Sequence, residues 1–310
     1  MRRRAFLGTL AGGLALGGTV STQQTTAPAT PPATGRAAAA PVTHLKGQFK
    51  QGVTAGVFRG LPGFEDQCRE AAKLGIKGFD LKGPADWPML KKYGLVPSMY
   101  QGPGGSINSA LNNLENHARL ETSLRAGIDE AAANGVPNII TFSGGRNPNP
   151  RGTPVPADIP DAQGADNCVA FLNKVKAQAE DKGVTLCMEY LNSKVNHAGY
   201  MFDHIAWGVD VMKRVNSPRV KILFDIYHAQ IMDGDIVRNI RTHYQWIGHF
   251  HTGGNPGRND IDDSQELNYR FIMQAIADLG FQGFVTHEYS PTMGHDPVET
   301  LKKAIDICTI

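Results

Sequence analysis

Four side chains that could bind a metal ion or move a proton end four apolar runs in the C-terminal half of the sequence. They are Glu189 in Cys-Met-Glu-Tyr, Asp225 in Leu-Phe-Asp-Ile, His251 in His-Phe-His-Thr and Glu288 in Thr-His-Glu-Tyr. Three carboxylates and one imidazole form a hard to borderline ligand set, which suits Mn²⁺, Mg²⁺ or Co²⁺, tolerates Zn²⁺ and disfavours soft metals. Without a cation, three buried carboxylates would repel one another strongly. These residue types therefore predict a site for one divalent metal ion.

The four side chains can meet only if the strands that carry them lie side by side. Beyond about residue 42, short apolar runs alternate with longer amphipathic ones, which is typical of repeated βα units. The predicted strands span residues 52–58, 75–81, 95–100, 138–142, 184–190, 220–227, 247–251 and 283–289. Helical patterns span residues 64–74, 108–134, 166–182, 204–215, 265–279 and 297–307. Several of these patterns are followed by a glycine, as expected at a helix C-cap.

Eight strands that alternate with helices in a chain of 310 residues predict a single α/β domain, a (βα)8 TIM barrel. A doubly wound open sheet is the structural alternative. It would need a glycine-rich phosphate turn after the first strand, and Phe-Arg-Gly-Leu-Pro-Gly at residues 58–63 does not match that fingerprint. In a barrel the active site lies at the C-terminal ends of the strands, where all four side chains are found.

Two further histidines lie next to these positions. His249 points the same way as His251 but lies one layer deeper in the barrel, so we expect a buried hydrogen-bond partner rather than a ligand. His287 has the opposite parity to Glu288 and should face the helices. Neither histidine is therefore included among the predicted site residues.

The charge of the chain argues against a nucleic-acid partner. The sequence has 31 basic and 29 acidic residues, for a formal charge of +2. Four of the basic residues, Arg2, Arg3, Arg4 and Arg36, lie in an N-terminal stretch that we expect to be removed, which leaves a mature charge of about −2. A slightly acidic domain has no electrostatic footprint for nucleic acid.

The N-terminus resembles a twin-arginine export signal. Met-Arg-Arg-Arg-Ala-Phe-Leu precedes an apolar stretch at residues 9–20. That stretch is shorter than the roughly 20 residues that span a bilayer, and no cysteine follows it directly to accept a lipid anchor. Residues 21–41 are rich in Thr, Ala and Pro and cannot repay the entropy of ordering. We therefore expect a signal peptide and linker at 1–41, and a soluble barrel domain at 42–310 that is exported to the periplasm or beyond.

The four cysteines are Cys68, Cys168, Cys187 and Cys308. They are widely spaced and form no Cys-x-x-Cys pair, so we expect buried thiols. Whether two of these cysteines form a disulfide in an oxidising compartment stays open.

Several longer motifs surround the four side chains. They are Glu189-Tyr-Leu-Asn-Ser, His197-Ala-Gly-Tyr, Phe224-Asp-Ile-Tyr-His-Ala-Gln, Ile247-Gly-His-Phe-His-Thr-Gly-Gly-Asn-Pro-Gly-Arg, Glu266-Leu-Asn-Tyr and His287-Glu-Tyr. Together these motifs resemble the hydroxypyruvate isomerase family, one of the xylose-isomerase-like TIM barrels, as are the ketose 3-epimerases and endonuclease IV. The resemblance covers most of residues 47–310 and is densest between residues 184 and 290.

The resemblance implies a metal-dependent isomerase that moves a carbonyl between adjacent carbons of a small keto acid or sugar through a cis-enediolate. It implies that Glu189, Asp225, His251 and Glu288 bind the metal ion, and that Glu189 and Glu288 also act as acid and base. The chemistry agrees, because a cation polarises a carbonyl while two carboxylates take and return a proton.

Two more residues are candidates for substrate contact. His228 follows Asp225 by three residues, and it would hydrogen-bond a substrate oxygen, as in the related epimerases, or anchor its own loop. Arg258 lies in a Gly/Asn/Pro loop, where it would pair with a substrate carboxylate or vicinal hydroxyls, or stay solvated. Weaker candidates in the loops after two earlier strands are Arg146, Arg151 and Lys82.

Three other functions stay open. A ketose 3-epimerase or an isomerase of an oxidised sugar fits because His251 stands where some hydroxypyruvate isomerases have glutamine, and histidine is the epimerase-like residue. A phosphodiesterase similar to endonuclease IV would need histidine ligands on the early strands, and residues 80–82 and 98–101 supply none. A non-catalytic sugar-binding protein usually closes two lobes over its ligand, and no mid-chain boundary would create them. The expected partner is a small molecule, and homo-oligomerisation stays open.

Overall fold

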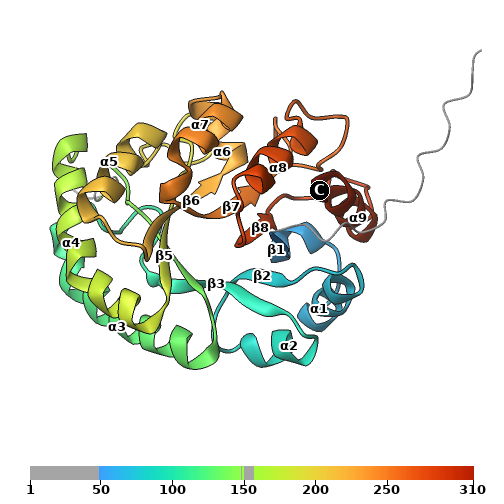
Figure 1. Ribbon diagram of the computed structural model, residues 1–310, viewed down its shortest axis with the longest axis horizontal. Helices are drawn as coiled ribbons and strands as arrows, with labels where there is room; N and C mark the ends of the chain where they lie inside the picture. Colours follow the sequence, from blue (N-terminus) through green and yellow to red (C-terminus); the bar gives the residue numbers. More distant parts are fainter. Residues whose placement is uncertain (1–48, 148, 150–156) are drawn as a thin grey trace, which may run out of the picture. The chain divides into compact units, whose positions relative to one another are not determined.

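Eight parallel strands close into a barrel in sequence order, with the helices outside them (Figure 1). The predicted (βα)8 barrel is therefore confirmed. The computed structural model describes residues 49–147, 149 and 157–310. The predicted signal peptide and linker at 1–41, and Arg151, lie outside the described residues.

Each strand pairs in parallel with the next, and β1 pairs with β8 to close the ring. The strands are β1 (Lys50–Val53), β2 (Gly78–Lys82), β3 (Val96–Gly104), β4 (Asn138–Thr141), β5 (Thr185–Glu189), β6 (Val220–Asp225), β7 (Ile247–Thr252) and β8 (Phe284–His287). In this register Glu189 pairs with Leu223, and Asp225 pairs with His251. The C-terminal ends of β5, β6 and β7 therefore reach the same rim of the barrel.

Nine α-helices follow or flank the described strands. They are α1 (Phe64–Lys73), α2 (Trp87–Lys92), α3 (His117–Asn134), α4 (Asp161–Lys182), α5 (Ile205–Val215), α6 (Ile226–Met232), α7 (Ile236–His243), α8 (Tyr269–Asp278) and α9 (Pro297–Cys308). The short 3₁₀ helices are η1 (Ala55–Phe58), η2 (Leu114–Asn116) and η3 (Tyr244–Trp246). As predicted, Gly135 and Gly183 end α3 and α4 in the left-handed region, with φ of 71° and 70°.

Local hydrogen bonds explain where the predicted boundaries were wrong. The predicted strand 220–227 ends at Asp225, because the Asp225 side chain accepts a hydrogen bond from the backbone N–H of His228 and so caps α6. The predicted helix 108–134 begins only at His117, after a turn and the 3₁₀ helix η2. The first strand begins two residues earlier than predicted and is followed by η1. The helices α2, α6 and α7 are short and were not predicted.

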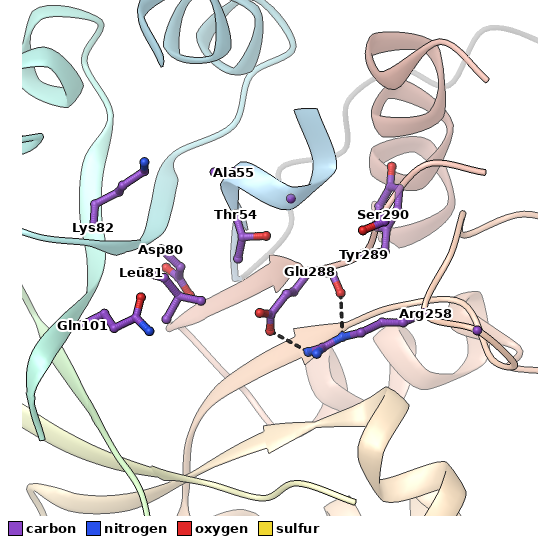
Figure 2. Close-up of a pocket in the computed structure, with 12 residues that line it drawn as sticks. Thr54, Ala55, Asp80, Leu81, Lys82, Gln101, Arg258, Glu288, Tyr289 and Ser290 are labelled. Carbon is purple, nitrogen blue, oxygen red and sulfur yellow. Dashed lines mark hydrogen bonds and ion pairs between the residues drawn. The ribbon is translucent and has the colours of Figure 1, made fainter. Parts of the chain in front are cut away.

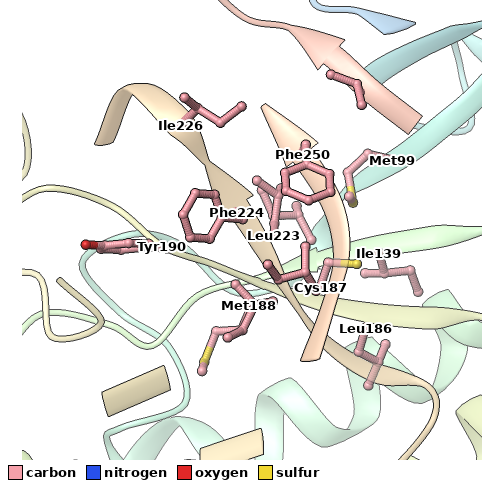
Figure 3. Packing of buried hydrophobic residues seen from close by; sticks show 14 of the residues in the cluster. Met99, Ile139, Leu186, Cys187, Met188, Tyr190, Leu223, Phe224, Ile226 and Phe250 are labelled. Atoms are coloured by element: carbon pink, nitrogen blue, oxygen red, sulfur yellow. The ribbon is translucent and has the colours of Figure 1, made fainter. Parts of the chain in front are cut away.

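The main apolar core lies between the strands and the surrounding helices. Phe224 and Phe250 are fully buried there, at positions that alternate with inward-facing residues (Figure 3). The interior of the barrel is more polar, since Ser98, His249 and Thr286 are also fully buried. Nε2 of His249 lies 3.2 Å from Oγ1 of Thr286. A hydrogen-bonded polar layer thus lies beneath the C-terminal rim.

Two glycines let the strands approach this polar layer. A Cβ on Gly78 would lie 2.3 Å from Oγ of Ser98 and 2.7 Å from the ring of Phe284. A Cβ on Gly52 would lie 2.4 Å from Oγ1 of Thr286. Any larger side chain at either position would therefore displace the buried polar groups.

The four cysteines are buried, unpaired thiols, as predicted. Burial raises the pKa of Cys187 and Cys308 to about 12, so these thiols stay protonated. In the part of the chain that the structure describes, no helix is both long and apolar enough to cross a bilayer.

Candidate active site

The four predicted ligands meet at the C-terminal rim of the barrel. Glu189 ends β5, Asp225 ends β6, His251 lies near the end of β7, and Glu288 directly follows β8. One side-chain ligand atom from each residue lies within 4.8 Å of the other three. Three of the residues are buried, and Glu288 exposes 20% of its side chain. The cluster is therefore almost dry but open on the side of Glu288.

Burial and mutual charge set the protonation of these groups. Burial raises the pKa of Glu189 to about 7, and the charges of Glu288 and Asp225 add to this effect while His251 opposes it. Burial alone would lower the pKa of His251, but the nearby carboxylates hold that pKa well above its ordinary value. Nδ1 of His251 lies 2.5 Å from Oε2 of Glu288 and 3.5 Å from Oε1 of Glu189. The cluster therefore attracts positive charge.

Arg258 places a guanidinium beside two of the carboxylates. Its Nη2 lies 2.5 Å from Oδ2 of Asp225 and 2.7 Å from Oε2 of Glu288. Its Nε also donates to the carbonyl oxygen of Glu288, as Figure 2 shows. The loop after β7 holds Arg258 at a φ of 56°, which is uncommon for a residue other than glycine. Arg258 thus reaches the predicted position, but its guanidinium is paired with acidic residues of the cluster.

His228 presents one ring nitrogen to the same cluster. Its Nδ1 accepts hydrogen bonds from Asn192, with 3.2 Å to the backbone N and 2.6 Å to Nδ2. The proton of a neutral ring is then on Nε2, which lies 3.8 Å from Oδ2 of Asp225 and has no hydrogen-bond partner among the described residues. Burial and the charges of Arg258 and His197 hold the pKa of His228 well below its ordinary value. His228 is therefore a neutral N–H donor.

Asp80, which the sequence analysis did not select, lies on the other side of His251. Its Oδ2 lies 2.6 Å from Nε2 of His249 and 3.0 Å from Nε2 of His251, and Ser98 donates to Oδ1. Burial alone would raise the pKa of Asp80, but the two imidazoles have the larger effect. The pKa of Asp80 therefore lies below its ordinary value. His249 is thus the buried hydrogen-bond partner that its deeper position in the barrel predicted. A polar residue in the second predicted strand was the only signal for Asp80.

The remaining predicted positions lie outside the cluster. His287 faces the helix layer, as predicted, and its ring nitrogens contact Thr252 and Gln51. Arg146 binds Asp161 and Asp203 and so holds the loop after β4. Both ion pairs thus hold the Arg146 guanidinium against the fold.

A cavity of about 370 Å³ opens beside the cluster (Figure 2). It is lined by residues within β2 and β3 and by residues that follow β1, β7 and β8, namely Thr54, Ala55, Gly56, Asp80, Leu81, Lys82, Gln101, Gly257, Arg258, Glu288, Tyr289 and Ser290. Oγ1 of Thr54 is buried and has no hydrogen-bond partner among the described residues. Lys82 places its Nζ 3.9 Å from the ring centre of Phe64. The cavity therefore suits a small polar molecule.

The donor set of the cluster fits one divalent cation. Its carboxylate oxygens and the Nδ1 of His251 converge, and hard to borderline divalent ions prefer this mixture of oxygen and imidazole nitrogen. That Nδ1 makes no hydrogen bond of good geometry within the described residues, which leaves it available to an ion. The residues that could hold the ion are Glu189, Asp225, His251 and Glu288. A second group, Asp80, His249 and His251, is also close enough, but hydrogen bonds account for its contacts.

Comparison with known proteins places the chain in a family. Residues 68–309 match the family model described as xylose isomerase-like TIM barrel. The chain belongs to this family. A Danio rerio protein with a provisional hydroxypyruvate isomerase name is 28% identical over 254 residues, which cover 76% of this chain and 87% of that protein. The 2-oxo-tetronate isomerase of Haemophilus influenzae is 26% identical over 244 residues, with coverage of 74% and 88%. The predicted resemblance is therefore confirmed.

Other proteins that are similar to this chain carry different names. The D-psicose 3-epimerase of Ruminiclostridium cellulolyticum is 33% identical over 146 residues, which cover 46% of this chain and 47% of that protein. The structure of an AP endonuclease, family 2 protein from Brucella melitensis has a TM-score of 0.70 at 23% identity and covers 82% of this chain and 97% of that one. The IolI protein, solved with a bound zinc atom, has a TM-score of 0.63 at 13% identity, with coverage of 84% and 98%. At these identities the two structures show a shared fold.

Proposed function

We propose that this protein is a divalent-metal-dependent isomerase that moves a carbonyl between adjacent carbons of a small keto acid or sugar. The observation that carries the proposal is the convergence of Glu189, Asp225, His251 and Glu288 within 4.8 Å at the barrel rim. The names of the relatives, a provisional hydroxypyruvate isomerase and a 2-oxo-tetronate isomerase, support a keto-acid or sugar substrate. The zinc atom bound by IolI supports a metal ion in this fold. The oxygen-rich donor set favours Mn²⁺, Mg²⁺ or Co²⁺.

Glu189 and Glu288 are the proposed acid and base. They come from β5 and β8, which lie on either side of β6 and β7 in the ring, so their carboxylates approach the centre from different directions. Isomerisation removes a proton from the carbon α to the carbonyl and returns one to the former carbonyl carbon through a cis-enediolate, while the hydroxyl hydrogen on the α carbon moves to the former carbonyl oxygen. Each carboxylate can take or give that proton.

The surroundings of the two glutamates favour different roles. Burial alone would raise the pKa of Glu288, but the positive charges of Arg258 and His251 have the larger effect and lower this pKa below its ordinary value. Burial raises the pKa of Glu189 to about 7. Two carboxyl groups whose pKa values are pushed apart can serve as base and acid at the same pH. We therefore assign the first proton abstraction to Glu288 and the proton return to Glu189.

The other residues of the cluster hold and orient the reactants. When bound, a divalent cation would polarise the substrate carbonyl and stabilise the negative charge that develops on its oxygen. Asp225 would bind the ion and take no part in proton transfer, since its carboxylate also caps α6 and pairs with Arg258. His228 donates its Nε2 hydrogen to a substrate oxygen, because Asn192 occupies Nδ1. Arg258 keeps two ligand carboxylates in place from the edge of the cavity.

A ketose 3-epimerase is the second candidate function. The similarity to a D-psicose 3-epimerase favours it, and so does the imidazole at position 251. The same two glutamates would then remove and return a proton on opposite faces of one carbon. The products differ, since an epimerase inverts a carbon and leaves the carbonyl where it was.

We further propose that the mature enzyme is exported through the twin-arginine route as a folded protein. The Arg-Arg-Ala-Phe-Leu sequence at residues 3–7 supports this, together with the short apolar stretch that follows it. Cell fractionation tests it: replacement of Arg3 and Arg4 by lysine should retain the protein in the cytoplasm. Equal export of this variant would contradict the proposal.

Solvent deuterium tests the reaction directly. Protein loaded with Mn²⁺ is incubated with hydroxypyruvate and a panel of ketoses and keto acids in D₂O, and the products are identified by NMR and mass spectrometry. Deuterium on a carbon next to the carbonyl, with a displaced carbonyl, supports the isomerase. Deuterium at C3 with inverted configuration supports the epimerase instead. No incorporation with any substrate contradicts both, and Glu288→Gln is the matched control for adventitious exchange.

A further inference from the structure

We propose that Asp80 is a positioning residue that fixes the ring orientation and tautomer of His251, so that Nδ1 faces the divalent cation of the proposed active site. This inference rests on the proposed function, because it assumes that His251 is a ligand. Asp80 comes from β2, on the far side of the barrel from the acidic ligands of β5 and β6.

The contacts of Asp80 leave His251 one arrangement. Asp80 is fully buried, and its Oδ2 lies 3.0 Å from Nε2 of His251. A carboxylate only accepts hydrogen bonds, so Nε2 of the His251 ring carries a hydrogen, and an ion can displace a hydrogen only from Nδ1. The lone pair of a neutral ring is then on Nδ1, which lies 2.5 Å, 3.5 Å and 3.9 Å from Glu288, Glu189 and Asp225. The tautomer set by Asp80 is the one that an ion among these carboxylates requires.

Two neighbours hold the Asp80 carboxylate in place. Nε2 of His249 lies 2.6 Å from the same Oδ2, and the hydroxyl of Ser98 donates to Oδ1. Nε2 of His249 also lies 3.2 Å from Oγ1 of Thr286, so these polar contacts extend to β8. The rings of His249 and His251 meet edge to face, with 5.3 Å between their centres. Ser98 of β3 and His249 of β7 therefore hold the Asp80 carboxylate independently of its contact with His251.

The backbone of β2 is irregular where it presents Asp80. Its register against β3 shifts on both sides of Asp80. The next residue, Leu81, has a φ of 61°, a conformation that is a genuine outlier for a bulky side chain. Such strain persists where the surroundings over-determine it, and it is typical of functional sites.

Metal affinity separates positioning from a purely structural role. Mn²⁺ binding is measured by isothermal titration calorimetry on the mature protein and on Asp80→Asn, which keeps the shape of the side chain but not its charge. We expect about a 10- to 100-fold weaker affinity, as is usual when the partner of a ligating histidine is lost. The matched control is Asp233→Asn. Asp233 also contacts a histidine, with 2.6 Å between its Oδ1 and Nδ1 of His204, but this pair lies outside the cluster. The Mn²⁺ affinity of the control should stay within about twofold of wild type. A folded Asp80→Asn variant that binds Mn²⁺ as tightly as wild type would overturn the proposal.

A second measurement needs no variant of Asp80 and so covers the case in which Asp80→Asn fails to fold. The wild-type protein with ¹⁵N-labelled histidine is loaded with Zn²⁺, and long-range ¹H–¹⁵N NMR identifies the protonated nitrogen of each ring. The resonances of His251 are assigned by their loss in His251→Asn. We expect zinc on Nδ1 and a hydrogen on Nε2, and zinc on Nε2 would refute the inference. If wild-type protein binds no metal ion by either method, the proposed function fails as well.

Discussion

Replacement of Asp225 by asparagine should abolish most of the stabilisation that a metal ion gives this protein. The carboxylates of Glu189, Asp225 and Glu288 lie within 4.8 Å of one another. At an effective dielectric constant of about 20, each pair of unit charges at that distance repels by roughly 3.5 kcal/mol. Arg258 and His251 offset part of this repulsion, and a divalent cation would offset more. Metal binding should therefore raise the free energy of unfolding by several kcal/mol.

The expected size follows from binding linkage. A metal concentration a thousandfold above Kd adds about 4.1 kcal/mol to the stability of the folded state. For a domain of this size, each kcal/mol raises Tm by about 2 °C, so wild-type protein should gain about 8 °C. Asp225→Asn removes one charged ligand, and we expect its gain to fall below about 2 °C under the same conditions.

Differential scanning calorimetry with Mn²⁺ or with EDTA measures this difference. In EDTA the two proteins should unfold within a few degrees of each other, because the lost ion pair with Arg258 is offset by relief of repulsion from Glu189 and Glu288. Asp233→Asn is the control and should keep the full gain, since Asp233 binds Tyr190, His204 and the Ile205 backbone instead. A full metal-dependent gain in Asp225→Asn would refute the reasoning.

Three further predictions follow from individual side chains. Glu189→Gln should slow deuterium exchange by about 10²- to 10⁴-fold, the usual contribution of one acid or base, and exchange at the wild-type rate would exclude Glu189 from proton transfer. His228→Phe removes a buried N–H donor, so steady-state kinetics should show a higher KM. The apo Tm should fall by a few degrees, because two buried N–H groups of Asn192 lose their acceptor on Nδ1 of His228. Burial lowers the pKa of His287 to about 4, below its unfolded value. As pH falls, the unfolded chain therefore takes up a proton at His287 before the folded chain does. Urea titrations in EDTA should show the free energy of unfolding falling between about pH 6.5 and 4, and falling less steeply in His287→Gln.

The sequence was enough to predict the barrel and the convergence of its four proposed ligands. Strand parity and the shared rim of parallel strands decide where Glu189, Asp225, His251 and Glu288 point, and both can be read from local patterns. His249 has the same parity as His251, and its position one layer deeper in the barrel separated it, as a buried partner, from the cluster.

Other contacts depend on distances that no local pattern contains. Asp80 meets His251 across the barrel, and that pairing depends on the stagger of β2 against β7 and on a backbone irregularity at Leu81. Arg258 contacts two ligands because its loop adopts a left-handed backbone that its residue type does not favour. Asp225 has two roles, strand end and helix cap, so the predicted strand ran too far.

Anomalous diffraction from crystals soaked in Mn²⁺ tests the central claim most directly. Data collected at the manganese absorption edge locate the ion without reference to any assumed ligand. We predict one strong peak in the barrel, bonded to carboxylate oxygens of Glu189, Asp225 and Glu288 and to Nδ1 of His251. A peak held by Asp80 and His249 instead, or no peak within bonding distance of the four residues, would contradict the account.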